Sequence, residues 1–86
     1  MKQSEVTVQW EQGLHLRPAA KLVRVGQDAK SSVVIKSGGQ IANIKSIMSI
    51  LMLCATMGTT LTIEAHGEDE QEVTRAIATL FSGDDT

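Results

Sequence analysis

Two segments near opposite ends of the chain, residues 5–10 and 60–66, alternate apolar and polar side chains at every position. The apolar members of each segment fall on one side of an extended backbone: Val6, Val8 and Trp10 in the first, Leu61, Ile63 and Ala65 in the second. Strict alternation is typical of a strand that has one face in a core and the other in water. Both segments are therefore predicted to be half-buried strands.

Between them lie a hairpin and the start of a first helix. Residues 32–36 are rich in β-branched side chains, residues 37–39 read Ser-Gly-Gly, and residues 40–43 return as a short second strand. A turn of that composition between two strand-like runs predicts a β-hairpin. Upstream, Pro18 predicts the opening of a helix, because proline is tolerated only in the first turn, and Gly26 lies near its end.

Two more helices complete the order. Ser46 suits the N-cap of a second helix, predicted to run to about Thr56 before Gly58 stops it, with Cys54 among its buried residues. Residues 68–70 are acidic and favour the N-terminus of a third helix that ends at Gly83. The buried stripe of this third helix is predicted to be Val73, Ile77, Leu80 and Phe81.

The resulting order is β-α-β-β-α-β-α, which predicts an α+β fold with a four-stranded sheet covered on one face by three helices. With 86 residues, 42% of them hydrophobic, the chain can bury one modest core, so residues 1–86 are predicted to form a single domain. The net charge of -2 argues against a nucleic-acid partner. The apolar run 47–55 is too short to span a bilayer and no signal peptide opens the chain, so a cytoplasmic location without membrane insertion is expected.

The segment Gly13–Ala20, GLHLRPAA, carries the chemistry. It places His15 just before the proline-started helix and Arg17 in its first turn, where backbone N–H groups lack internal partners and the helix dipole is positive. Such a terminus binds anions, and a guanidinium can bond two phosphate oxygens at once. A neutral imidazole there is a nucleophile beside a phosphate cradle. The alternative is an incidental surface histidine. His15, His66 and Cys54 lack metal-ligand spacing, so neither metal nor cofactor is expected.

The run Gly13–Ala20 resembles the active-site signature of the HPr family, the histidine-containing phosphocarriers of the phosphoenolpyruvate-dependent sugar phosphotransferase system. Residues 45–48, Lys-Ser-Ile-Met, resemble the regulatory serine segment of that family, and residues 67–70 resemble its last strand-to-helix junction. The resemblance covers nearly the whole chain. It implies an open-faced β-sandwich whose antiparallel sheet has the strand order 1-4-2-3.

The resemblance also implies an activity. Enzyme I would pass a phosphoryl group to Nδ1 of His15, Arg17 and the backbone of residues 16 and 17 would stabilise it, and the A domains of enzymes II would receive it. The chain would then be a monomeric, stoichiometric carrier rather than an enzyme. Leu16 departs from the family, which usually has a small residue there, and Ser49 and Cys54 stand where glycine is common. These departures bear on partner fit more than on the transfer reaction.

A docking surface for those partners is predicted on two helices. On the second helix, the apolar side chains expected to project outward are Ile47, Met48 and Leu51. On the first helix, Leu16 is joined by a basic stripe that follows helical spacing, Arg17, Lys21 and Arg24, and suits acidic partners. The alternatives are that Ile47 or Leu51 covers a core edge and that the basic stripe is a solvated face.

Ser46 has two compatible roles, as an N-cap and as the target of an HPr serine kinase/phosphorylase that would add negative charge beside the docking surface. Two other functions stay open. A nitrogen-regulatory paralogue would use the same His15 chemistry with different partners. A passive module binding RNA or a metabolite would have another function altogether, although RNA-binding sheets rely on paired strand aromatics and this chain has only Trp10 in a predicted strand.

Overall fold

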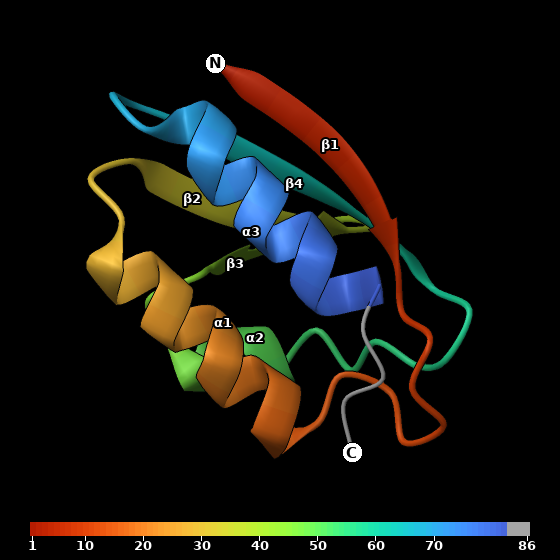
Figure 1. Ribbon diagram of the computed structural model, residues 1–86. Coiled ribbons are helices and arrows are strands. Elements are labelled where there is room, and N and C mark those ends of the chain that lie inside the picture. The colour runs from red at the N-terminus through yellow and green to blue at the C-terminus, as the bar shows by residue number, and fades with distance from the viewer. Residues whose placement is uncertain (83–86) are drawn as a thin grey trace.

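The alternating segments become neighbouring strands of one antiparallel sheet. The computed structural model describes residues 1–82, and in it the strands β1 (Lys2–Thr7), β2 (Ser32–Ser37), β3 (Gln40–Asn43) and β4 (Thr60–His66) lie in the order β1-β4-β2-β3. The helices α1 (Leu16–Asp28), α2 (Ile47–Leu51) and α3 (Glu70–Ser82) cover one side of this sheet (Figure 1). The predicted fold class, including the strand order, is confirmed.

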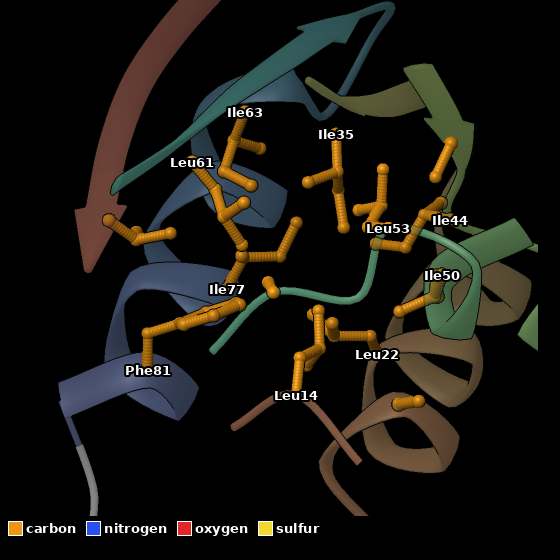
Figure 2. Packing of buried hydrophobic residues seen from close by; sticks show 14 of the residues in the cluster. Leu14, Leu22, Ile35, Ile44, Ile50, Leu53, Leu61, Ile63, Ile77 and Phe81 are labelled. Atoms are coloured by element: carbon orange, nitrogen blue, oxygen red, sulfur yellow. The ribbon is translucent and has the colours of Figure 1, made fainter. Parts of the chain in front are cut away.

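The register of the sheet keeps apolar side chains in rows that cross several strands. Val6 of β1 pairs with Leu61 of β4, and Ile63 of β4 pairs with Ile35 of β2, and all four are buried. Figure 2 shows Leu61, Ile63 and Ile35 from these rows in one apolar cluster with buried side chains of the helices. Side chains drawn there from outside the sheet include Leu14, Leu22, Ile50, Ile77 and Phe81. The polar rows of the strands form the open face.

The first strand lies earlier than predicted. It spans Lys2–Thr7 rather than residues 5–10, yet the alternation continues beyond it, because Val8 and Trp10 are both buried. Pairing of the backbone also continues past Thr7. The Val8 N–H donates to the Thr59 carbonyl at 2.9 Å, and the Gly58 N–H donates to the Val8 carbonyl at 2.8 Å. The burial pattern was therefore predicted correctly, whereas the strand boundary was not.

The second helix is much shorter than predicted. It ends at Leu51 instead of near Thr56, because the backbone hydrogen bonds that follow span three residues rather than the four of an α-helix. These bonds run from the Leu53 N–H to the Ile50 carbonyl and from the Cys54 N–H to the Leu51 carbonyl, both at 3.1 Å. Cys54 then adopts a left-handed φ of 51° and its side chain is exposed, so its predicted burial is wrong. Apolar side chains taken to be parts of one long helix belong instead to a turn that buries Leu53 and points Cys54 outward.

The third helix buries the predicted residues Val73, Ile77 and Phe81, whereas Leu80 is only half-buried at the edge of the core. Gly83, the predicted end of this helix, lies outside the described residues. Within residues 1–82, no helix combines the length and the apolar character needed to cross a bilayer.

Candidate functional site

His15 is the N-cap residue of α1, with an extended backbone at φ -98° and ψ -168°. The first bond of the helical ladder runs from the Ala19 N–H to the His15 carbonyl at 3.0 Å. The amides of Leu16 and Arg17 therefore precede the ladder, and Pro18 has no N–H to contribute. The structure thus places His15, Arg17 and two backbone amides that lie outside the helical ladder at the same helix terminus, as the sequence predicted.

Two buried anchors fix the backbone on either side of His15. On one side the Leu14 N–H donates to the Ala55 carbonyl at 2.9 Å, a contact that we call the Leu14–Ala55 tie, and the Leu14 side chain is buried in the core. On the other side Ala19 is completely buried in the first turn of α1. The histidine is therefore presented by a constrained segment even though its own side chain is half-exposed.

Gly13 makes this approach possible. Its φ is 74°, in the left-handed region that favours glycine, and a Cβ at this position would lie 2.5 Å from the Ala55 carbonyl oxygen. A side chain here would push the strand exit away from the turn after α2. The close approach to Ala55 is a requirement that the sequence alone did not reveal.

An open depression of about 930 Å³ lies beside the histidine. Its lining comes from the segment before α1 and from one face of that helix: Gln9, Trp10, Glu11, Gln12, His15, Leu16, Arg17, Ala20, Lys21 and Arg24. Three of these side chains are cationic and one, Glu11, is anionic. The structure therefore brings the predicted basic stripe to the same hollow as His15. The polar residues 9, 11 and 12 were not predicted from the sequence, although their closeness to Gly13 in the chain was a usable signal.

Both aromatic residues of the chain are buried. Trp10 is 5% exposed, and its ring lies 5.1 Å from that of Phe81, centroid to centroid, at a tilt of 35°. Neither ring is available on the open face of the sheet for stacking with bases. The RNA-binding alternative therefore loses the side chains it would need.

The His15 imidazole does not cap its helix, since it accepts no hydrogen bond from the first turn. Its nitrogens are accordingly not committed to the helix that they border. In the part of the chain that the structure describes, no group of three His, Cys, Asp or Glu side chains is arranged to hold a metal ion. His15 thus lies beside backbone amides and an open depression in which three cationic side chains outnumber one carboxylate.

The acidic groups whose pKa values are shifted make contacts that stabilise the fold. The pKa of Asp69 is lowered, first by the hydrogen bond from the Lys30 N–H at 3.0 Å and then by that from the Ser31 hydroxyl, so Asp69 ties the start of α3 to the loop before β2. The pKa of Glu70 is lowered, first by the Gly67 N–H at 3.0 Å and next by the N-terminal ammonium at 3.2 Å.

A third such group lies on the open face of the sheet. Hydrogen bonds from Lys36 at 2.9 Å and then from Gln3 at 2.7 Å lower the pKa of Glu64 and link three strands. None of these three acids lines the depression beside His15. Glu64, Asp69 and Glu70 therefore make structural contacts and do not surround the histidine.

The predicted docking residues of α2 divide into two kinds. Met48 is 67% exposed, whereas Ile47 and Leu51 are half-buried and pack against the core, so they cover a core edge as the alternative allowed. The N-cap prediction for Ser46 is confirmed, because its Oγ accepts the Ser49 N–H at 3.2 Å. The helices α1 and α2 lie side by side (Figure 1).

Comparison with known proteins gives consistent results. Residues 2–83 match a family model described as the PTS HPr component phosphorylation site. The phosphocarrier protein HPr of Haemophilus influenzae is 39% identical over 81 residues, which cover 94% of this chain and 95% of that protein. A crystal structure of HPr from Thermoanaerobacter tengcongensis, 32% identical, superposes with a TM-score of 0.90 over 95% of this chain and 92% of that one. An HPr dimer from the same organism, also 32% identical, gives 0.75 over 95% and 94%.

Proposed function

We propose, given that this chain belongs to the HPr family of phosphocarriers of the phosphotransferase system, that it accepts a phosphoryl group from phospho-enzyme I on Nδ1 of His15 and donates it to enzyme II A domains. The observation that supports this most is the position of His15 as N-cap of α1, directly before two amides outside the helical ladder. It is the arrangement that phosphoryl transfer by positioning and charge stabilisation requires.

The proposed step forms one bond to phosphorus and breaks another. The lone pair of Nδ1 attacks the phosphorus atom, the bond between phosphorus and the donor breaks, and the donor keeps that electron pair. The phosphoryl oxygens then accept hydrogen bonds from the N–H groups of Leu16 and Arg17 and from the Arg17 guanidinium. Because these contacts are noncovalent and open to the hollow, the group can leave toward an acceptor by the same path.

Labelling with phosphoenolpyruvate tests the proposal. With enzyme I and radiolabelled phosphoenolpyruvate, the wild-type chain should take up one label per molecule, acid-labile and base-stable, and lose it to an enzyme II A domain. His15→Ala should take up none, while His66→Ala, which removes an exposed histidine at the end of β4, should behave as wild type. An unlabelled wild type, or equal labelling of His15→Ala, would end the proposal. In the absence of an acceptor domain, a carrier should stop consuming phosphoenolpyruvate after one equivalent per molecule, whereas an enzyme would continue to turn over.

The docking surface on this proposal combines Leu16, Lys21 and Arg24 of α1 with Met48 of α2. Ile47 and Leu51 support it from the core edge, since both are half-buried. Exposed methionine adapts to differently shaped partners, and the basic stripe suits acidic ones. The nitrogen-regulatory alternative uses the same surface and differs in the enzyme I and A domain that it meets. Parallel labelling with the two kinds of enzyme I distinguishes these branches.

We further propose that an HPr serine kinase/phosphorylase modifies Ser46. The half-exposed Ser46 hydroxyl lies two residues before the exposed Met48, so a phosphate there would put about two negative charges beside the docking surface. Ser46→Asp should slow labelling by enzyme I at unchanged far-UV circular dichroism, whereas Ser46→Asn keeps a capping side chain without the charge and should label normally. Equal rates for the two variants would contradict an electrostatic block.

On the same basis we propose that residues 1–86 work as a single domain, as a monomer and in the cytoplasm. The dimer known for a relative makes the oligomeric state the part to test first. Light scattering across a range of protein concentrations should give the monomer mass throughout. A mass that doubles at the concentrations used for labelling would replace the monomer with a dimer.

A further inference from the structure

Leu16 has an exposed aliphatic side chain that does not belong to the hydrophobic core. It is the first residue of α1, its side chain is 61% exposed, and it belongs neither to the buried core nor to the half-buried side chains packed against that core. Its neighbours Leu14 and Pro18, in contrast, are buried. Stability therefore gives no reason for a leucine here.

The place of Leu16 relative to the proposed chemistry is specific. It follows His15 directly and lines the same depression of about 930 Å³ that holds His15 and Arg17. In-line transfer requires the phosphorus atom to come within about 3–3.5 Å of the histidine nitrogen. A protein donor that brings its phosphoryl group so close must also cover the adjacent residue, so Leu16 is buried by the donor in every productive encounter.

We propose that Leu16 is a specificity-determining residue that selects donors with an apolar recess beside their phosphoryl group. The proposal rests on the proposed function, because it concerns the donor that His15 meets. A donor whose surface is flat at that point would be held away from His15 by the isobutyl group. A donor with a matching recess gains the burial of that group and excludes water from the transfer site.

The charged side chains of the depression indicate which charges the donor's surface should carry around the recess. The depression has three cations on one face of α1, Arg17, Lys21 and Arg24, and one carboxylate, Glu11. A complementary partner surrounds its apolar recess with carboxylates on the side that meets these cations. The occupant is thus a folded protein surface that is apolar at its centre and acidic around it, and it presents a phosphoryl group at the margin of the recess.

The chain offers a matched control for the test. Ile41, on the edge strand β3, is 65% exposed, close to the 61% of Leu16, but does not line the depression. Initial rates of labelling are measured against carrier concentration with the enzyme I of the same organism, for wild type and for Leu16→Ala, Leu16→Asn and Ile41→Ala. Loss of buried methyl groups in an apolar pocket is worth roughly 10-fold or more.

The expected result is a KM raised about 10-fold for Leu16→Ala and at least as much for Leu16→Asn, which keeps the size but not the apolar character. The kcat and melting temperature should stay near wild type, and Ile41→Ala should match wild type throughout. A second enzyme I is taken from an organism whose carrier has alanine directly after the active-site histidine. With this enzyme I, Leu16→Ala should have a lower KM than wild type.

Two outcomes would overturn the proposal while leaving the proposed function intact. One is that Leu16→Ala and Ile41→Ala label alike with both donors, and the other is that Leu16→Asn keeps the wild-type KM. An unlabelled wild type would instead contradict the proposed function itself. Every variant remains capable of labelling in principle, because His15 and Arg17 are unchanged in all of them.

Discussion

Replacing Gly13 with alanine should destabilise the fold near the histidine by an amount that the structure lets us divide into parts. A left-handed φ of 74° costs an L-residue about 1–2 kcal/mol. The new Cβ would lie 2.5 Å from the Ala55 carbonyl oxygen, which forces the Leu14–Ala55 tie to lengthen and forfeits about 1 kcal/mol. Reduced freedom of the unfolded chain returns about 0.4–1 kcal/mol. The net loss is about 2 kcal/mol, or roughly 10 °C in melting temperature for a domain of this size.

Two other glycines separate these contributions. Gly38, in the hairpin turn, has a φ of 58° and nothing within 4 Å of an added Cβ, whereas Gly39 has open space and no left-handed φ. Urea unfolding should therefore rank the alanine variants Gly39, Gly38, Gly13 in order of increasing loss, with Gly39→Ala within about 0.5 kcal/mol of wild type. If Gly13→Ala unfolds at the same urea concentration as Gly38→Ala, the close contact with Ala55 contributes nothing and the reasoning is wrong.

Three further predictions concern single side chains. Arg17→Ala should lower the maximal labelling rate by about 10²-fold, measured at saturating carrier, because one strong donor to the phosphoryl oxygens is lost; Arg17→Lys should fall between, and an unchanged rate would refute the role. Cys54→Gly should raise the urea midpoint or leave it unchanged, since glycine relieves the left-handed φ of 51°, whereas Cys54→Val should lower it; the reverse order would contradict the turn geometry. Asp69→Asn should be less stable than wild type at pH 7, and the difference in stability should shrink as the pH falls below about 4. The reason is that the pKa of Asp69 is lowered in the folded state, so its contribution to stability is lost as the pH drops through that folded pKa. A difference in stability that stays constant down to pH 2 would count against the hydrogen bonds from Lys30 and Ser31.

The order of elements was predictable because each element carries a local signal. Alternation gave the buried faces of β1 and β4, and the Ser-Gly-Gly turn gave the hairpin with β3 at its observed bounds of Gln40–Asn43. The end of α2 was not predictable in this way. An apolar run has the same composition in a helix and in a buried turn, and the left-handed Cys54 depends on contacts that close only in the folded chain.

The proposed site shows the same division. His15 and Arg17 could be placed at a helix start because the proline that marks that start lies within three residues of both. The Leu14–Ala55 tie joins residues about 40 positions apart, so no local pattern reports it. The depression beside His15 depends on how residues 9–12 fold back against α1, which is likewise a tertiary property.

The central claim is that the backbone N–H groups of Leu16 and Arg17 donate hydrogen bonds to the phosphoryl group carried by His15. The most direct measurement is a pair of ¹H–¹⁵N correlation spectra, recorded before and after phosphorylation by enzyme I and phosphoenolpyruvate, with the amide of Ile41, which does not line the depression, as a reference. The amide protons of Leu16 and Arg17 should move downfield and exchange more slowly, while that of Ile41 stays in place. A fully phosphorylated His15 with both amides unmoved would contradict the account.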